Sequence, residues 1–218
     1  MAKTLKTPRT KLRRKPGRGS HERATIEAIL DEALVCHVGV VDEGVPVVIP
    51  TLHARVGSRV YLHGSTASRM LRLAAGSQVC LTATLIDGLV LARSAMHHSA
   101  NYRSAILFGA GEPVEDEAEK LTALEALVEK LVPGRWADAR QPTAKELRAT
   151  AVLRLPLDQA SAKIRTGPPI DDDADLALPV WAGVVGLRTV AAEPQPDELL
   201  APGLGRPAYV DDLLRAHA

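Results

Sequence analysis

Apolar positions at one-sided helical spacing mark two longer helices. Residues 23–34 and residues 121–131 both place their Ile, Leu and Val side chains on one face, which predicts amphipathic helices. The second helix should end at Pro133-Gly134, because proline cannot continue a helix and glycine is common just past its end. A further short helix is expected over residues 143–150.

The other apolar segments are rich in valine and are separated by turn residues, which is typical of strands. Strands are predicted over residues 35–41, 45–56, 59–63, 79–86, 89–95, 105–109, 150–155 and 161–165. Asp87-Gly88 is a two-residue hairpin signal. Short strands joined by tight turns predict a mainly β fold, an antiparallel barrel with helices on its outside, rather than a parallel α/β sheet.

A fourth helix is expected over residues 65–75, with Ser65 as its N-cap and Gly76 just past its end. Its start carries three hydroxyls and Arg69, directly after the strand that ends at Gly64. A helix N-terminus has unpaired N–H groups and a positive dipole end, so this pattern indicates a possible phosphate site.

Charge divides the chain unevenly. Residues 1–20 hold eight of its 27 basic residues and no acidic one, which leaves 19 basic against 26 acidic residues in the remainder. We therefore expect a basic disordered arm over 1–20, one domain over 21–190 and a tail rich in Pro and Asp over 191–218. An acidic body with a short basic arm makes a nucleic-acid partner unlikely on this pattern.

Several targeting and ligand classes are not predicted. No run of 18 apolar residues occurs, so no membrane span is expected. The basic start is not followed by an apolar segment, and Cys36 and Cys80 lack metal-ligand spacing, which predicts a cytoplasmic protein with reduced cysteines. The adjacent His97 and His98 cannot chelate one ion, and the acidic run 171–173 fits a solvated loop, so no metal site is expected.

The order of the predicted elements, together with a set of short segments, carries a family resemblance. The segments are Ala28–Asp31 with Val35–Gly39, Val48–Thr51, Tyr61–Gly64, Thr84–Val90, His97–Ser104 and Val180–Val184. Over residues 22–190 the chain resembles the pyridoxamine 5′-phosphate oxidase-like, FMN-binding split-barrel superfamily. It is most similar to the flavin-nucleotide-binding branch that includes nitroimidazole-resistance reductases.

The resemblance implies an antiparallel split β-barrel with peripheral helices that binds FMN at the interface of a homodimer. It also implies which residues hold the flavin. Val48, Ile49, Pro50, Thr51 and Leu52 would follow the ring, with His63 and Gly64 near the ring and ribityl chain. Ser65, Ser68 and Arg69 would hold the phosphate. Asn101, Tyr102, Arg103 and Ser104 would form the other wall, and Trp181 would cover the flavin or fill the barrel core.

The chain also departs from the family pattern. Met70 stands where the oxidase branch has a lysine beside the phosphate, and Arg103 could compensate for it. No Arg, His and Lys cluster that would grip pyridoxamine phosphate is found near the C-terminus, so oxidation of vitamin B6 is not expected.

The resemblance implies a reductase of a small organic acceptor, with a reduced nicotinamide as a possible electron donor. His63 is the candidate catalytic residue, because an imidazole can bond a substrate or supply a proton near neutral pH. Three alternatives stay open: a deazaflavin in place of FMN, a barrel without a cofactor, and a flavin or haem carrier without turnover. For haem, an axial ligand could come from His37, His53, His63, His97 or His98.

Overall fold

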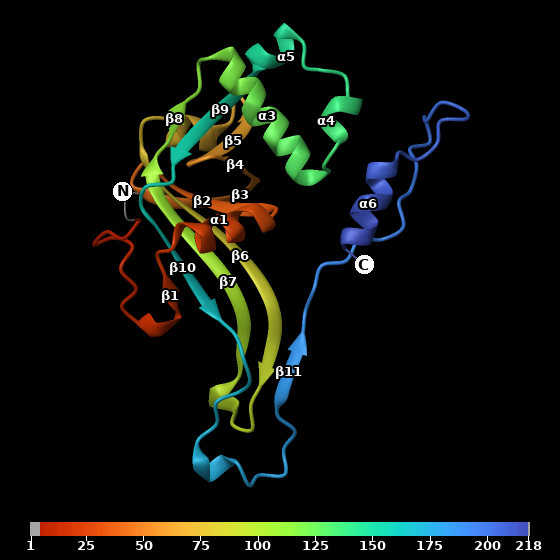
Figure 1. The fold of residues 1–218 in the computed structure, drawn as a ribbon. Coiled ribbons are helices and arrows are strands. Elements are labelled where there is room, and N and C mark those ends of the chain that lie inside the picture. The colour runs from red at the N-terminus through yellow and green to blue at the C-terminus, as the bar shows by residue number, and fades with distance from the viewer. Residues whose placement is uncertain (1–4, 218) are drawn as a thin grey trace.

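A computed structural model of the chain describes residues 5–217, and its strands form two antiparallel sheets (Figure 1). The seven-stranded sheet has the order β1-β10-β7-β6-β2-β3, with β11 also paired to β6. The four-stranded sheet has the order β4-β5-β9-β8. Helices lie around the two sheets, which confirms the predicted antiparallel split barrel with peripheral helices.

The large sheet contains β1 (Gly19–Ser20), β2 (Val35–Asp42), β3 (Val45–Leu52), β6 (Gln78–Leu91), β7 (Ser99–Ala110), β10 (Ala160–Arg165) and β11 (Gly183–Gly186). The small sheet contains β4 (Ala54–Val56), β5 (Arg59–Ser65), β8 (Glu112–Pro113) and β9 (Thr150–Pro156). The α-helices are α1 (Arg23–Glu32), α2 (Arg69–Ala74), α3 (Glu117–Leu131), α4 (Arg135–Asp138), α5 (Ala144–Ala149) and α6 (Ala208–Ala216). Single 3-10 turns cover Pro16–Arg18, Ala95–His97 and Asp173–Asp175.

The hairpin between β2 and β3 closes with a two-residue turn. Asp42 pairs with Val45, and the residues between them, Glu43 and Gly44, both have positive φ angles of 48° and 83°. Two positive φ values in a two-residue loop define a type I′ turn, whose twist matches that of the strands. The expected strand 45–56 is interrupted at His53, where the chain leaves the large sheet and enters the small one.

The hairpin predicted at Asp87-Gly88 is wrong. β6 runs through this dipeptide with only a shift of register between Ile86 and Gly88, and the reversal to β7 follows at Ala95–His97 (Figure 1). Gly88 is needed for a different reason: a Cβ there would lie 2.9 Å from the carbonyl oxygen of Val185 in β11. The dipeptide therefore makes a bulge that admits a neighbouring strand.

The core lies between the two sheets, with α1 and α2 covering it. Ile26, Ile29 and Leu30 of α1 are fully buried against it, as is Leu62 of β5. Residues 105–107 of β7 alternate between buried and exposed positions, so one face of the large sheet faces the core and the other faces outward. The outer face of the small sheet packs instead against α3.

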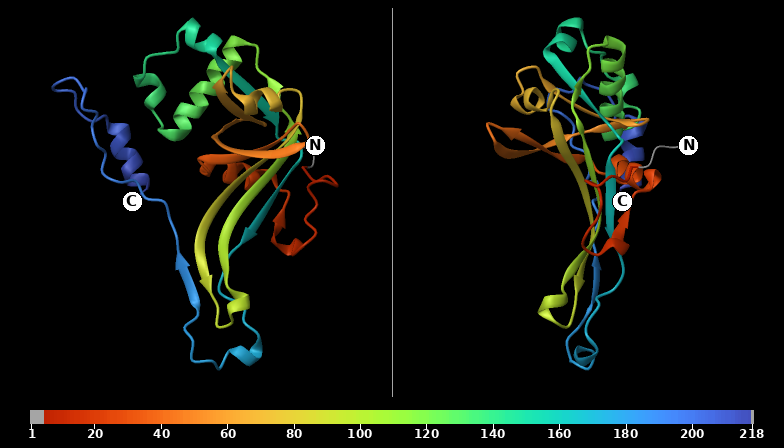
Figure 2. Two further views of the ribbon diagram at one scale, coloured as in Figure 1. Left: turned by 180° about the vertical axis from the view of Figure 1, so that it is seen from behind. Right: turned by 90° about the vertical axis from the view of Figure 1, so that its left-hand side faces the viewer.

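The C-terminal segment extends away from the body. After β10 it loops below the tip of the β6–β7 hairpin, returns as β11 and rises to α6, which stands beside α4 (Figures 1 and 2). Tyr209 of α6 bonds Arg135 and Asp138 of α4. No helix within residues 5–217 is long and apolar enough to cross a membrane.

The N-terminal segment is placed against the body over residues 5–20, and not as a disordered arm as predicted from its charge. Leu5 is fully buried in the core, and its carbonyl accepts a bond from the Ala160 N–H. Gly19 and Ser20 pair with β10. The buried Leu5 side chain and the strand pairing of residues 19–20 therefore hold this strongly basic segment on the body, although its composition alone predicts disorder. Residues 1–4 of the predicted arm lie outside the described residues.

Candidate functional site

The segment predicted to follow the flavin ring, Val48–Leu52, forms the second half of β3. β3 ends the large sheet, and among the described strands it pairs only with β2. Val48 is 62% exposed and lies opposite Gly39, while Pro50 lies opposite His37. Directly opposed residues share a face of the sheet. This segment therefore borders an open surface on the outer face of β2 and β3.

That outer face carries exposed apolar side chains from four strands, namely Val35, Val41, Val48, Ile86 and Ile106. The exposed His37 and Thr84 lie on the same face. Exposed apolar side chains gathered on one face of a sheet mark a candidate site of interaction with a ligand or another protein. We call the five apolar residues the outer face.

The residues predicted for the phosphate lie between β5 and α2, but the helix starts later than predicted. Its N-cap is Ser68, whose hydroxyl accepts a bond from the Leu71 N–H at 3.4 Å. Ser65 is still part of β5, where it pairs with Thr150, and its hydroxyl accepts a bond from the Ala67 N–H at 3.1 Å. The expected N-cap at Ser65 is therefore wrong, because pairing with β9 continues through this residue.

Arg69 follows this cap and is largely exposed, yet its charge has a partner. Its guanidinium forms an ion pair with Asp42 at the end of β2. A phosphate bound here would have to share the guanidinium with that carboxylate. Met70, where the oxidase branch has a lysine, is buried in the core, which is the packing reason for this departure.

Arg103 is held by two carboxylates in the middle of β7. It bonds Glu32 at the end of α1 and Asp87 of β6, the latter at 2.7 Å and 3.0 Å. Hydrogen bonds from Arg103 lower the pKa of Glu32, and the two carboxylates raise the pKa of Arg103. An arginine so occupied ties α1 to the sheet and offers little to a phosphate.

Asn101 and Ser104 of the same predicted wall also make internal bonds. The Asn101 side chain accepts from Arg165 and donates to the Gly167 carbonyl at 3.2 Å. Ser104 donates to the Lys163 carbonyl at 3.3 Å. No side-chain bond of Tyr102 is found within the described part of the chain.

This wall and the phosphate residues lie apart within one protomer. Arg103 pairs with Leu85 of β6, Cys80 pairs with Gly39 of β2, and the partner of Arg69 is Asp42. Continuing this register puts Asp42 level with residue 77, whereas Arg103 is level with Leu85, eight residues further along the chain. At the usual rise of a strand, this separation is roughly 25 Å. The structure therefore does not bring the two groups together in a single chain.

Trp181 lies at yet another place. It immediately precedes β11, near the tip of the β6–β7 hairpin, and is 66% exposed. Its ring lies against Gly183, where a Cβ would meet it at 2.7 Å. It does not fill the barrel core, which leaves a role at an interface or over a ligand.

His63 faces a cavity of about 410 Å³ between β5 and the helices α3, α4 and α5. The ring is half-buried, and its Nδ1 is buried without a hydrogen-bond partner among the described residues. Burial lowers the pKa of His63, so its imidazole is neutral at neutral pH. Sequence reasoning placed His63 near the flavin and missed this cavity.

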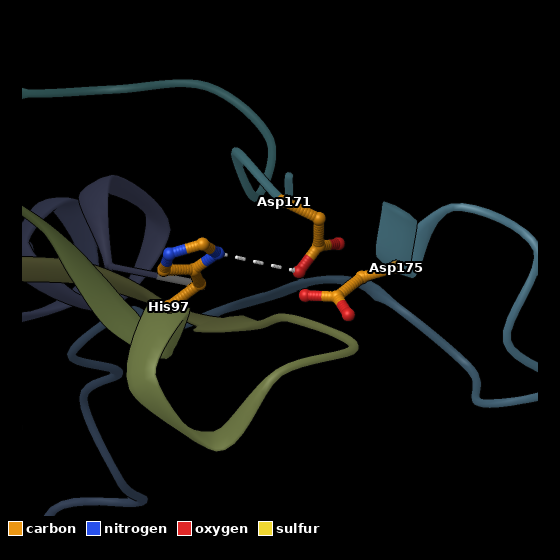
Figure 3. Close-up of side chains that lie close together, drawn as sticks. All are labelled: His97, Asp171 and Asp175. Carbon is orange, nitrogen blue, oxygen red and sulfur yellow. Dashed lines mark ion pairs between the residues drawn. The ribbon is translucent and has the colours of Figure 1, made fainter. Parts of the chain in front are cut away.

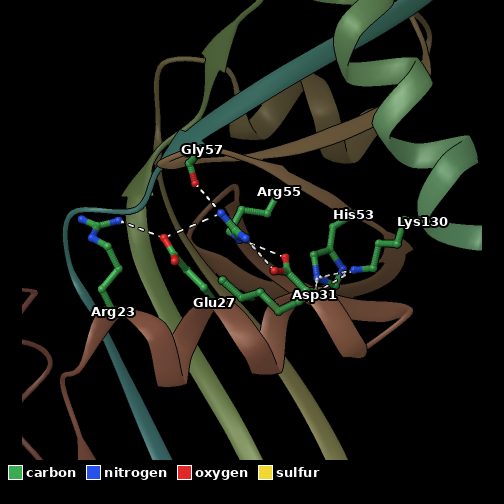
Figure 4. A network of polar contacts seen from close by, with 8 residues as sticks. Arg23, Glu27, Asp31, His53, Arg55, Gly57 and Lys130 are labelled. Carbon is green, nitrogen blue, oxygen red and sulfur yellow. Dashed lines mark hydrogen bonds and ion pairs between the residues drawn. The ribbon is translucent and has the colours of Figure 1, made fainter.

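A second histidine, His53, is fully buried in a polar network that joins α1, β4 and α3 (Figure 4). Its Nε2 lies 2.9 Å from the Leu30 carbonyl oxygen and 3.1 Å from the Lys130 ammonium. Burial and the Lys130 charge lower the pKa of His53 to about 4, and burial lowers the pKa of Lys130 to about 8. Arg55 continues the network through Asp31, which it bonds at 2.9 Å. The network joins three elements through bonds within the chain.

His97 lies close to two acidic residues of the loop after β10 (Figure 3). Its Nδ1 is 3.9 Å from Asp171, but that carboxylate already accepts from the Arg93 N–H at 2.9 Å and from its guanidinium at 3.1 Å. Asp175 completes the cluster. Asp171 therefore bonds the loop after β10 to the end of the β6–β7 hairpin, and this structural role accounts for the cluster.

The basic N-terminal segment helps to form a polar cavity of about 460 Å³ beside this loop. The cations that line it are Arg14, Lys15, Arg18, Lys163 and Arg165, together with His97 and His98. Such a concentration of positive charge attracts anionic groups. The run of basic residues was visible in the sequence, but only the fold shows that Arg14, Lys15 and Arg18 lie beside Lys163 and Arg165 of β10.

The chain matches the family model described as pyridoxamine 5′-phosphate oxidase over residues 22–164. None of the curated proteins compared with the chain matches it.

Solved structures give longer matches. The flavocytochrome Anf3 from Azotobacter vinelandii is 41% identical, with a TM-score of 0.91 over 97% of this chain and 98% of that one. The FAD and haem binding protein from Mycobacterium smegmatis is 39% identical, with a TM-score of 0.86 over 90% and 97%. A putative 5-nitroimidazole antibiotic resistance protein from Bacteroides thetaiotaomicron is 28% identical, with a TM-score of 0.56 over 67% and 86%.

Proposed function

The chain belongs to the pyridoxamine 5′-phosphate oxidase family, and on this basis we propose that it is a flavin-binding redox protein that works as a homodimer. The observation that carries the proposal is the match over nearly the whole chain with a protein described as a flavocytochrome and with one described as FAD and haem binding. The flavin would supply the hydride or electron transfer, and the protein its binding and orientation.

The edge of β3 and the outer face are the proposed location of the flavin ring. β3 presents a free edge, whose unpaired backbone groups can bond a polar ring, and Pro46 and Pro50 fit such an edge because they lack N–H groups. Ser68 and Arg69 would hold the phosphate, with the guanidinium shared between Asp42 and the ligand. The proposed site therefore consists of residues of β3 together with Ser68 and Arg69, which were all predicted from the sequence.

A second copy is the proposed cover of the outer face. Burying apolar surface is favourable by about 25 cal/mol per Å². It would also bring the partner's equivalent of the Asn101–Ser104 strand toward the phosphate end, from which one protomer keeps it distant. The proposed dimer is thus also a way to complete the flavin site.

Two observations favour different forms of the flavin. Resemblance of the sequence predicts FMN, whereas the relative described as FAD binding favours the dinucleotide. Both contain the same ring and first phosphate, and the mass of the cofactor released by denaturation distinguishes them. A small organic acceptor and a nicotinamide donor complete the proposed reaction. The sequence has no Arg, His and Lys cluster near its C-terminus of the kind that would grip pyridoxamine phosphate, which argues against oxidation of that substrate.

The test is the visible spectrum of the purified protein after addition of FAD or FMN and removal of the excess. We expect flavin absorption to stay with the protein and to be weakened in Arg69→Ala. Arg72→Ala, which changes an exposed arginine of the same helix, is the matched control. Protein that retains neither flavin would refute the proposal.

A further inference from the structure

The cavity at His63 has walls suited to a large apolar ligand. α3 contributes one stripe of side chains, Leu124, Leu127, Val128 and Leu131, at helical spacing. Trp136 of α4 and Leu147 of α5 line it as well. Part of the apolar face of this amphipathic helix therefore lines an open space.

One side chain in this space can bind a metal through nitrogen. Of the described residues that line the cavity, His63 is the one histidine, and no cysteine or methionine is among them. Its buried Nδ1 lacks a partner, although buried polar atoms are nearly always bonded. No hydrogen bond to either ring nitrogen of His63 is found within the described residues, and a polar side chain without a partner among apolar neighbours is unfavourable unless a ligand satisfies it.

We propose that this cavity binds a haem and that His63 is its axial ligand. A ring nitrogen of histidine is a standard ligand of haem iron, and the leucine stripe and Trp136 would contact the macrocycle. The volume of about 410 Å³ falls in the usual range for cofactor pockets. Relatives of 41% and 39% identity are described as a flavocytochrome and as haem binding, which agrees with this ligand class.

The rim offers a cation for a propionate. Arg140 lines the cavity, and its guanidinium donates to the Gln141 carbonyl at 2.8 Å and to the two Glu146 oxygens at 2.7 and 3.0 Å. An arginine has five N–H groups, so donors remain for a second carboxylate. The bonds to Glu146 also hold the guanidinium in place at the start of α5.

The other histidines fit the role less well. His53 is fully buried, and its Nε2 lies within hydrogen-bond distance of Leu30 and Lys130. His37 lies opposite Pro50, on the same side of the sheet as the outer face, where the flavin is proposed. His63 is kept neutral by burial, and the neutral imidazole is the form that binds metal.

The proposal extends the proposed flavin function but uses different chemistry and mostly different residues. Flavin and haem absorb at separate wavelengths, so one spectrum reports both. Wild-type protein that shows flavin absorption but no Soret band would overturn only the haem site. Loss of flavin with a retained Soret band would overturn only the flavin site.

The experiment titrates the full-length protein with haemin and follows the Soret band, comparing wild type with His63→Ala. We expect a saturable Soret band in the wild type, its loss in His63→Ala, and its recovery when free imidazole is added to that variant. His98→Ala, an exposed histidine far from the cavity, should bind as the wild type does.

A second variant tests the site independently, in case His63→Ala fails to fold. Leu124→Trp keeps His63 and fills the cavity from α3, so it should also lose haem binding while its circular dichroism spectrum stays unchanged. Wild-type protein without a saturable Soret band, or His63→Ala and Leu124→Trp with unchanged haem binding, would overturn the proposal.

Discussion

His53 and His63 are both shielded from solvent, but their surroundings give them different roles. His53 and His63 both have pKa values lowered by burial. The Nε2 of His53 lies 2.9 Å from the Leu30 carbonyl oxygen and 3.1 Å from the Lys130 ammonium in a close-packed interior, whereas His63 faces a cavity. The first residue therefore stabilises the fold, and the second is available to a ligand.

His53 should make the protein sensitive to acid. Its pKa is about 4 in the folded state against 6.5 as a free group, so unfolding takes up a proton between these values. Stability is then fully present above pH 6.5 and falls as the pH approaches 4, by up to about 3 kcal/mol. Urea denaturation of wild type and His53→Gln at both pH values tests this. Glutamine can still donate to Leu30 and accept from Lys130, so its stability should fall less; equal losses would contradict the assignment.

Arg103 should contribute stability through its carboxylates. We expect Arg103→Gln to lower the free energy of unfolding at pH 7 by about 1 kcal/mol, since the ion pairs are partly exposed. The lowered pKa of Glu32 places this contribution above the carboxyl's unfolded pKa, and it is lost as the pH falls through the folded value. Urea denaturation at neutral and acid pH measures it. Arg72→Gln is the control, and an equal effect there would argue against the network.

At the scale of elements, β6 shows pairing overriding a turn signal. Asp87-Gly88 has the residues of a tight hairpin, yet a strand of 14 residues passes through it. Asp87 is bonded to Arg103 on one side of the strand, and β11 approaches Gly88 on the other. Contacts from distant parts of the chain outweigh the local preference.

Gly88→Ala should loosen the C-terminal segment. The added Cβ would lie 2.9 Å from the Val185 carbonyl oxygen, so β11 has to move away from β6. We expect faster limited proteolysis between residues 166 and 190, with the barrel left intact. Gly186→Ala is the matched control, because nothing lies within 4 Å of its Cβ. Equal cleavage of the two variants would show that this contact does not hold the strand.

At the scale of the whole molecule, the exposed apolar surface calls for a partner. The outer face and the separated C-terminal segment both leave large side chains uncovered, among them Val48 and Trp181. The C-terminal segment runs along one side of the body, where β11 pairs with β6 and α6 bonds α4 (Figure 2). Both features agree with the proposed homodimer.

Val48→Glu should disrupt that dimer. A carboxylate at the centre of an apolar interface would lose its hydration without a partner, which is costly. We expect a lower mass by size-exclusion chromatography with light scattering, together with weaker flavin retention. Leu199→Glu, at a position 92% exposed in the tail, should leave the mass unchanged. A dimer that persists in Val48→Glu would place the interface elsewhere.

Periodicity alone predicted much of the barrel. The spacing of apolar residues located α1, α3 and the strands β2, β9 and β10, because each of them buries apolar side chains in one of the two hydrophobic clusters. It could not locate the start of α2, where pairing of Ser65 with β9 decides the boundary. It also failed for residues 5–20, whose placement depends on Leu5 and β10.

The sequence by itself determined the antiparallel barrel, the family and the segments that could meet a flavin, because local patterns and motifs are written along the chain. Only the tertiary structure decided that Arg103 is occupied, that Arg69 and Arg103 lie apart, and that His63 opens into a cavity formed by three helices. Such properties depend on which distant residues become neighbours. A partner on another strand or helix can saturate a side chain or leave it open, and no spacing along the sequence records which.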